Sequence, residues 1–353
     1  MIMKQIIFNC IDELIDVLSD KSVMLVCGGS YDKLEISKKL NVLKPTRFSG
    51  FTPNPIYEDV CKGVELFKEQ SCNAILAVGG GSATDVAKCI KLFCKMNTDK
   101  NFLKQEYADT GIPLVVIPTT AGTGSESTRH AVIYLNGVKQ SVSHESIIPD
   151  YACLIPSVLD SLPVYQKKCT MLDALCQAIE SWWSRNATSE SIKYSRNAIE
   201  LIRDNFDEYI SYYSPKSAEK MLLASNYAGR AINITATTAP HAMSYKLTSL
   251  YGIPHGHAVG ICLPEVWKYM LKQTEESNTS EFDRLRQVFS ELPINIDWYV
   301  RLLKKLEIDS PTANDREKEI EILASSVNPE RLKNNPVALT ECTLKSLYER
   351  IVK

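Results

Sequence analysis

The chain has 353 residues, of which 44% are hydrophobic and 23% are charged. This is enough for two ordinary domains with apolar cores, and it excludes a disordered chain. The 40 lysines and arginines nearly balance the 42 aspartates and glutamates, so the formal net charge is −2, and no block of like charge occurs. We therefore expect neither nucleic-acid binding, which needs concentrated positive charge, nor a basic membrane-surface role.

No stretch approaches the roughly 18 to 20 consecutive apolar residues that a membrane span needs, and residues 1–10 lack the apolar core of a signal peptide. The eleven cysteines are odd in number, scattered, and nowhere spaced as C-x-x-C. This usage is typical of buried thiols in a reducing compartment rather than of disulfides or a thiolate metal site. We therefore expect a cytoplasmic location.

Three short apolar runs in the first half each end in a glycine-containing turn. They are residues 23–27 before Gly28, Gly29 and Ser30, residues 74–78 before Gly79, Gly80, Gly81 and Ser82, and residues 113–117 before the turn at 118–125. A helical periodicity follows the second turn. Strands that alternate with helices predict an open parallel α/β sheet that binds ligands along the carboxyl edge of its strands.

After Pro163 long helical periodicities dominate, at residues 168–183, 190–213, 217–233 and 297–306. The predicted fold is therefore an α/β domain with a parallel sheet at residues 1–160, followed by an all-α domain at residues 161–353. The polar stretch 308–319 contains a Ser-Pro pair and no apolar period. It is interpreted as a surface turn before a late helix.

Glycines at a strand end let the backbone come close to a ligand, and the next helix directs N–H groups toward an anion. One such turn can be required by packing alone, but three at successive strand ends favour a bound nucleotide. Two nearby charges have plain alternatives. Asp85 is also explained as a first-turn acid of its helix, and Lys88 as a solvated helix-face charge.

Three of the five histidines, His241, His255 and His257, fall within seventeen residues. Asp173 and Gln177 are four residues apart in a helical, mostly apolar stretch, so they share one face. An ionised carboxylate in such a place is costly unless a cation or donors neutralise it. Asp173, His241 and His255 would offer a divalent metal three oxygen and nitrogen ligands. His257 is predicted to be structural.

Four segments together resemble the group III metal-dependent, or iron-containing, alcohol dehydrogenases. They are AVGGGSATDVAK (77–88), IPTTAGTGSESTRHAVI (117–133), LDALCQAIES (172–181) and PHAMSYKLTSLYGIPHGHAVG (240–260). The resemblance spans both halves in the family's order. It implies a dehydroquinate synthase-like architecture, in which a dinucleotide-binding α/β domain and a helical metal-binding domain flank an active-site cleft.

By this resemblance, Asp173, His241 and His255 bind one divalent metal, Fe²⁺ or Zn²⁺. Two departures from the family pattern stand out. Gln177 occupies the position where the family usually has a fourth ligand, a histidine; the Gln177 amide oxygen could serve directly or through water. Tyr245 stands where many relatives have a histidine that assists proton transfer, so proton delivery runs through Tyr245, water or the cofactor ribose.

The resemblance also implies a nicotinamide cofactor. Its phosphates would lie on Gly79, Gly80, Gly81 and Ser82, its ribose and nicotinamide would lie near Thr119, Thr120 and Thr123, and Asp85 and Lys139 match further positions near it. Lys139 is grouped with Tyr245 as a candidate catalytic residue, although a solvated loop charge would also explain it. The first strand ends in Gly28, Gly29 and Ser30 rather than in an acid, which favours NADP(H) over NAD(H).

Gln177, residues 180–195 and residues 243–260 resemble the branch of phosphonoacetaldehyde reductases, which make 2-hydroxyethylphosphonate in phosphonate biosynthesis. Arg129, His130 and Lys246 are the candidate phosphonate contacts, with surface charge or packing as alternatives. Three other functions stay open: reduction of uncharged aldehydes or polyols, a lyase of the dehydroquinate synthase type, and a non-catalytic subunit. Relatives are often dimers, so a homodimer is expected.

Overall fold

The computed structural model describes residues 5–212, 214–276 and 279–353. The chain divides into two compact units. The first contains the residues up to Leu162 and the segment that ends at Gly229, and the second contains the segment from Pro163 and the residues from Arg230 to Lys353. The division falls inside helix α7 (Pro215–Thr235), which begins in the first unit and ends in the second.

The first unit is built on a six-stranded parallel sheet with the strand order β1-β8-β5-β4-β2-β3. Its strands are β1 (Ile6–Phe8), β2 (Val23–Cys27), β3 (Thr46–Phe48), β4 (Ala74–Gly79), β5 (Leu114–Pro118) and β8 (Tyr151–Cys153). The predicted parallel sheet is confirmed; β2 has the predicted bounds, β4 ends one residue later than predicted, and β5 begins and ends one residue later. The three strands of this sheet that were not predicted, β1, β3 and β8, have three residues each, which is too short to show a period.

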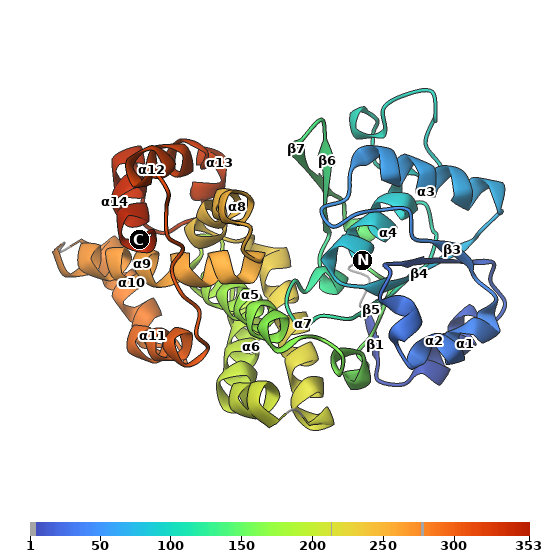
Figure 1. The fold of residues 1–353 in the computed structure, drawn as a ribbon, viewed down its shortest axis with the longest axis horizontal. Coiled ribbons are helices and arrows are strands. Elements are labelled where there is room, and N and C mark those ends of the chain that lie inside the picture. Colours follow the sequence, from blue (N-terminus) through green and yellow to red (C-terminus); the bar gives the residue numbers. More distant parts are fainter. Residues whose placement is uncertain (1–4, 213, 277–278) are drawn as a thin grey trace. The chain divides into compact units, whose positions relative to one another are not determined.

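Helices cover both faces of this sheet, because β2, β4 and β5 are buried along their whole length and must pack on each side. Alternate residues, such as Val26, Ala77 and Val116, share a core with α3 (Tyr57–Glu69) and α4 (Gly81–Phe93). Figure 1 shows α3 and α4 on one side of the sheet and α1 (Ile11–Leu18) and α2 (Ile36–Leu40) on the other. Right-handed crossovers between parallel strands produce this arrangement.

An antiparallel hairpin of β6 (His130–Leu135) and β7 (Val138–Ser143) follows the third glycine turn. Its two turn residues, Asn136 and Gly137, have φ values of 52° and 75°. Positive φ at both central residues is the signature of the tight turn whose twist matches that of paired strands. The hairpin is therefore specified locally, and it carries Lys139 on β7.

The described residues of the second unit form helices and their connections, with no strand, as predicted. Its helices are α5 (Val164–Trp183), α6 (Ser189–Asp207), the end of α7, α8 (Ala239–Tyr251), α9 (His255–Glu276), α10 (Ser280–Ser290), α11 (Ile296–Lys305), α12 (Arg316–Ser325), α13 (Pro329–Leu332) and α14 (Glu341–Ile351).

Two predicted boundaries in this region are wrong. The helix expected over 190–213 ends at Asp207 and gives way to a π-helical turn, Glu208–Tyr212; residue 213 lies outside the described residues. The turn expected over 308–319 ends earlier, because the side chain of Asp315 accepts a hydrogen bond from the backbone N–H of Lys318 and starts α12 at Arg316.

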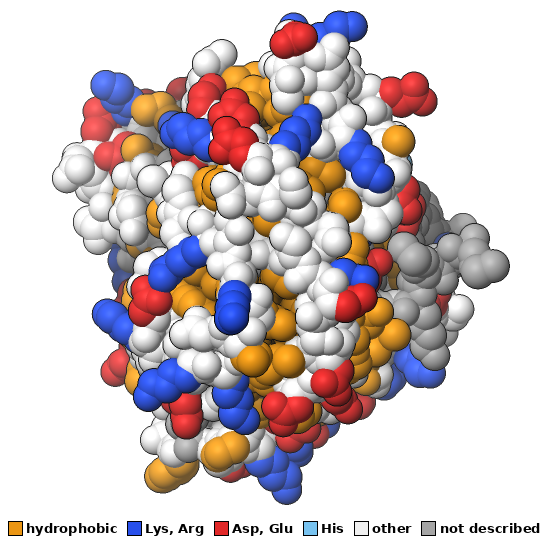
Figure 2. Space-filling view, turned by 90° about the vertical axis from the view of Figure 1, so that its right-hand side faces the viewer, with side chains coloured by type: hydrophobic (Ala, Val, Ile, Leu, Met, Phe, Trp, Pro, Cys, Tyr) orange, Lys and Arg blue, Asp and Glu red, His pale blue; other side chains and the backbone are white. Residues whose placement is uncertain are grey.

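The molecular face shown in Figure 2 mixes lysine and arginine side chains with aspartate and glutamate side chains, and neither sign forms a block there. This mixture agrees with the near balance of charges in the sequence. No helix of the described residues is long and apolar enough to cross a membrane.

Candidate functional site

The three glycine turns lie along one edge of the first unit's sheet. In the parallel register Cys27 pairs with Val78, and Val78 pairs with Ile117, so β2, β4 and β5 end side by side. The backbone N–H of Thr119 also donates a hydrogen bond of 3.0 Å to the carbonyl of Gly79. The carboxyl edge of the sheet thus brings together the backbone groups that the sequence assigned to a nucleotide.

Packing explains some of these glycines and leaves others unexplained. A Cβ added at Gly79 would lie 2.6 Å from the Cβ of Ala83, and one at Gly81 would lie 3.1 Å from Cγ2 of Thr123. A Cβ at Gly28 or Gly29 would meet no atom within 4 Å. The chain itself therefore does not require the last two glycines, whereas a ligand that lies against the backbone would.

Gly80 is the N-cap of α4, a helix of 13 residues, and a Cβ there would make only ordinary contacts of 3.5 Å with Thr120. Ser82, Thr119, Thr120 and Thr123 are all partly exposed around this helix start. Hydroxyl groups and the N–H groups of a first helical turn suit a phosphate-bearing ligand. The residues present along the edge therefore fit a dinucleotide.

Asp85 and Lys88 fix the third glycine turn from within the protein. Asp85 accepts hydrogen bonds from the hydroxyl of Ser125 (2.9 Å) and the backbone N–H of Val132 (3.1 Å). Nζ of Lys88 donates to the same hydroxyl of Ser125 (3.1 Å) and to the carbonyl oxygens of Thr128 (2.7 Å) and His130 (2.8 Å). Both side chains thus anchor the turn and the start of β6.

The solvated alternative for Lys88 is wrong, because the residue is 0% exposed. Burial lowers the pKa of Lys88 to about 8, although the nearby Asp85 and Glu126 carboxylates oppose this. Burial likewise raises the pKa of Asp85, against the charge of Lys88. The two residues lie on one helical face three positions apart, and the role of Asp85 near a cofactor stays a proposal.

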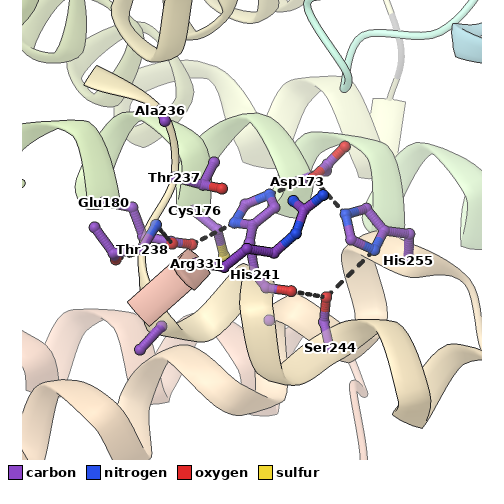
Figure 3. A network of polar contacts seen from close by, with 12 residues as sticks. Asp173, Cys176, Glu180, Ala236, Thr237, Thr238, His241, Ser244, His255 and Arg331 are labelled. Carbon is purple, nitrogen blue, oxygen red and sulfur yellow. Dashed lines mark hydrogen bonds and ion pairs between the residues drawn. The ribbon is translucent and has the colours of Figure 1, made fainter. Parts of the chain in front are cut away.

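In the second unit, Asp173 on α5, His241 on α8 and His255 on α9 converge (Figure 3). One donor atom from each lies within 4.8 Å of the others. Nε2 of His241 is 3.3 Å and Nε2 of His255 is 3.8 Å from Oδ1 of Asp173. One anionic oxygen and two imidazole nitrogens that face a common point fit a divalent cation.

Both histidines are oriented by hydrogen bonds at their other ring nitrogen. Nδ1 of His241 contacts the carboxylate of Glu180, which is 0% exposed and also accepts from the backbone N–H (2.6 Å) and hydroxyl (2.9 Å) of Thr238. Nδ1 of His255 lies 3.4 Å from the hydroxyl of Ser244. These contacts turn both Nε2 atoms toward Asp173, which is the arrangement of a histidine ligand with a supporting carboxylate.

Opposing effects set the charges of this cluster in the metal-free protein. Burial raises the pKa of Asp173, but hydrogen bonds from His241 and Gln177 and the charge of His255 outweigh it and leave the pKa below its ordinary value. Burial lowers the pKa of His241, yet the Glu180 and Asp173 carboxylates raise it to about 9. His241 is therefore protonated at neutral pH, and a divalent ion bound at its Nε2 atom would have to displace that proton.

Gln177 lies on the same buried face of α5 as Asp173 and hydrogen-bonds to its carboxylate. The shared face predicted from their four-residue spacing is thus confirmed. This contact places the Gln177 amide beside the three converging donors. Its service as a fourth ligand is a proposal.

The cluster can form because α5 and α9 approach closely at Gly256. A Cβ at this position would lie 1.9 Å from the carbonyl oxygen of Cys169 and 3.1 Å from Cβ of Asp173. Only a glycine lets the backbones come this near. The contact sets the first turn of α9, and with it His255, against the turn of α5 that carries Asp173.

We expect Gly256→Ala to lower the free energy of unfolding by about 1 to 3 kcal/mol, since the new methyl group must push backbone apart. Gly260→Ala is the matched control four residues along α9, where a Cβ would lie 3.3 Å from a flexible end of Leu172. Denaturant unfolding of both variants and calorimetric Zn²⁺ titration provide the comparison. Equal stability and equal metal affinity in the two variants would contradict this account of Gly256.

Comparison with known proteins shows to which family this chain belongs. The sequence profile of the iron-containing alcohol dehydrogenases matches residues 3–156, and the profile of the C-terminal domain of the Fe-containing alcohol dehydrogenase family matches residues 168–352. The chain belongs to the iron-containing alcohol dehydrogenase family. Within this family, the probable alcohol dehydrogenase EutG of Escherichia coli is 35% identical over 223 residues, which are 61% of this chain and 56% of EutG.

Two further proteins are similar to this chain, one in sequence and one in fold. The phosphonoacetaldehyde reductase of Streptomyces viridochromogenes is 34% identical over 207 residues, 55% of this chain and 52% of that protein. The crystal structure of a sulfoacetaldehyde reductase from Bifidobacterium kashiwanohense in complex with NAD+ has a TM-score of 0.87 at 24% identity, over 98% of this chain and 96% of that one. The second likeness is one of fold.

Tyr245, one of the departures from the pattern of the iron-containing alcohol dehydrogenases, lies beside the cluster. Its ring stacks on the His255 ring, with the ring centroids 5.5 Å apart and the two planes at an angle of 6°. Arg331 on α13 donates a hydrogen bond of 3.1 Å to the Tyr245 hydroxyl. Tyr245 is thus positioned next to a candidate metal ligand, as its proposed role in proton delivery requires.

The candidate substrate contacts Arg129, His130 and Lys246 are divided between the two units. Arg129 pairs with Glu145 in the first unit, and the backbone carbonyl of His130 accepts from Lys88. Lys246 follows Tyr245 on α8 in the second unit, and Lys139 on β7 acts electrostatically on Asp85. Arg129 directly precedes β6, and His130 is the first residue of that strand; their contact with a substrate stays a proposal.

His257 is structural, as predicted: Nδ1 lies 2.8 Å from the hydroxyl of Tyr165, and Nε2 lies 2.8 Å from the carbonyl oxygen of Asp309. Sequence reasoning missed Glu180 and Arg331. Glu180 lies seven residues after Asp173, two helical turns along the same face, and this spacing was the available signal. Arg331 follows Asn328 and Pro329 in a polar segment, and its sequence carries no comparable signal.

Proposed function

We propose that this chain is a metal-dependent aldehyde reductase that uses NADPH and converts phosphonoacetaldehyde into 2-hydroxyethylphosphonate. The observation that carries the proposal is the convergence of Asp173, His241 and His255 in a member of the iron-containing alcohol dehydrogenase family. The 34% identity to a phosphonoacetaldehyde reductase supports the substrate.

In this proposal Asp173, His241 and His255 hold one Fe²⁺ or Zn²⁺, and Gln177 offers a fourth donor. A bound divalent ion supplies Lewis-acid polarisation of the carbonyl oxygen, while the nicotinamide supplies the hydride. Tyr245 delivers the proton to the alcohol oxygen. Because its hydroxyl oxygen accepts a hydrogen bond from Arg331, Tyr245 keeps its own hydrogen as a donor.

The carboxyl edge of the sheet in the first unit would bind the cofactor. Gly79, Gly80, Gly81 and Ser82 receive the pyrophosphate at the start of α4, where backbone N–H groups favour anions. Thr119, Thr120, Thr123 and Lys139 lie toward the ribose and nicotinamide. Gly28, Gly29 and Ser30 leave room at the end of β2 for a 2′-phosphate, and no acid there repels it, which favours NADPH.

A spectrophotometric screen tests the function. The purified protein, supplied with Fe²⁺ or Zn²⁺, is offered NADPH or NADH with phosphonoacetaldehyde, propanal and glycolaldehyde. We expect kcat/KM for phosphonoacetaldehyde to exceed that for propanal about 100-fold, the factor that roughly 3 kcal/mol of charge-assisted hydrogen bonds provides. Comparable values for charged and uncharged aldehydes would defeat the substrate assignment.

The same screen separates the competing functions. Efficient reduction of propanal would favour a general alcohol dehydrogenase. The similarity to EutG supports this alternative. Turnover without net consumption of NADPH would favour a lyase of the dehydroquinate synthase type. Absence of both metal binding and cofactor fluorescence quenching would favour a non-catalytic subunit.

We also propose a homodimer in a reducing compartment such as the cytoplasm. All eleven cysteines are free thiols in the structure, which supports the reducing compartment. Size-exclusion chromatography with light scattering tests the homodimer, and a molar mass equal to that of a single chain would contradict it.

A further inference from the structure

Arg331 is a cation beside the candidate metal cluster. Its guanidinium lies over the ring of Tyr245, 5.1 Å from the centroid, and donates to the Tyr245 hydroxyl. The same ring stacks on His255, and Nε2 of His255 faces Asp173. Figure 3 shows Arg331 between the two histidines in that view, with Asp173 behind. The contacts thus run continuously from the arginine to the converging donors.

Within the described part of the chain, Arg331 forms no ion pair with a carboxylate. Its neighbours on and after α13 behave differently: Lys333 pairs with Glu330 at 2.6 Å. A half-buried guanidinium without a counter-ion carries a desolvation cost, unless an anion completes its surroundings when bound. Its remaining N–H groups form a planar fork that matches a tetrahedral oxyanion.

His255 is the most exposed of the three converging donors. The side chains of Asp173 and His241 are only 6% and 5% exposed, whereas that of His255 is 36% exposed. A ligand therefore reaches the donors past His255, which is the residue that Tyr245 and Arg331 adjoin.

Charge balance favours an anionic group. With a divalent ion bound and His241 neutral, the carboxylates of Asp173 and Glu180 balance the ion, and Arg331 leaves one positive charge in excess. The Tyr245 ring lies between Arg331 and His255, and an anion near both the guanidinium and a divalent ion would offset the repulsion between these two cations. Tyr245 contributes because a neutral ring can carry a guanidinium on its face, whereas a protonated histidine at this position would repel it.

The position of Arg331 is fixed by the segment that follows it. The side chain of Asn334 donates to the carbonyl of Thr237 (3.1 Å), and that of Asn335 donates to the carbonyl of Val337 (2.6 Å). The backbone N–H of Arg185 donates to the carbonyl of Asn334 (3.1 Å). The bonds of Asn334 attach the segment after α13 to the loop before α8 and to the residues that follow α5, so the backbone that carries Arg331 is anchored within the protein.

We propose that Arg331 binds the anionic group of the substrate, so that this site selects small aldehydes that carry a phosphonate or sulfonate. This inference rests on the proposed aldehyde reductase function and deepens it. It assigns substrate charge recognition to an arginine of the metal-binding unit, in addition to the candidates Arg129, His130 and Lys246.

The experiment compares Arg331→Gln, Arg331→Lys and the unaltered protein, all with Zn²⁺. We expect Arg331→Gln to raise KM for phosphonoacetaldehyde about 30-fold with a smaller change in kcat, and to reduce the ratio of kcat/KM for phosphonoacetaldehyde over propanal at least about tenfold. Arg331→Lys keeps the positive charge but lacks the planar pair of N–H donors, so its KM for phosphonoacetaldehyde should rise less than that of Arg331→Gln. Lys333→Gln is the matched control, because it removes an exposed, paired cation from the same segment.

Calorimetric binding of ethylphosphonate and of ethanesulfonate gives a readout without turnover, and thermal melts show whether each variant is folded. A Kd for either anion raised at least about tenfold in Arg331→Gln supports the inference, and the two anions show which group is preferred. An unchanged Kd and an unchanged substrate ratio in folded Arg331→Gln would overturn it, as would the same loss in Lys333→Gln. If the unaltered protein binds these anions through Arg331 but reduces no aldehyde, the proposed function alone fails.

Discussion

We expect Asp173→Asn to lose metal binding and at least about 100-fold in kcat/KM. Asp173 contributes the anionic oxygen among the three converging donors, and both histidine Nε2 atoms face it. The asparagine amide has nearly the same shape but carries no charge, and it is a poor ligand for a divalent ion. Since loss of a supporting residue alone lowers metal affinity about 10- to 100-fold, loss of a ligand should exceed that range.

Elemental analysis of the purified variant measures the metal, and the NADPH assay measures the activity. Asp16→Asn is the control, because Asp16 is an exposed acid on α1 of the first unit. Full retention of metal by Asp173→Asn would exclude the ligand assignment. Loss of metal in both variants would indicate a purification effect instead.

Glu180→Gln weakens metal binding about 10- to 100-fold, and the loss is clearest at pH 9 and above. In the unaltered protein the Glu180 and Asp173 carboxylates raise the pKa of His241 to about 9. Protons therefore compete with the metal for His241 below that pH, and affinity should rise as the pH rises from 6.5 to 9. Without the negative charge of Glu180, burial lowers the pKa of His241, so the rise levels off at lower pH.

The sign of the stability change follows from the same shift. A folded-state pKa of His241 above its ordinary 6.5 stabilises the metal-free protein fully below pH 6.5, and this contribution is lost as the pH rises through about 9. Glu180→Gln should flatten this dependence. Titration of the His241 ring by NMR, with Zn²⁺ calorimetry at several pH values, checks both effects. An unaltered pH profile in the folded variant would contradict the role given to Glu180.

Local sequence signals determined the architecture well. Buried runs before glycine turns located β2, β4 and β5, because a strand buried on both faces shows as an unbroken apolar run. Helical periodicity located the second unit. It failed where one or two residues decide the boundary, as at Asp315, which starts α12 inside a predicted turn. The short strands β1, β3 and β8 carried no period and were missed.

The sequence by itself also determined the chemistry of the donors, since an acid in an apolar helix and two clustered histidines are costly or rare without a function. What surrounds them was decided by tertiary structure alone. Glu180 meets His241 across 61 positions, and Arg331 meets Tyr245 across 86. From the sequence alone, Lys88 is interpreted as a surface charge, but the tertiary structure surrounds its Nζ atom with four hydrogen-bond acceptors. Such contacts depend on how helices pack against one another, and no local pattern of residues encodes that packing.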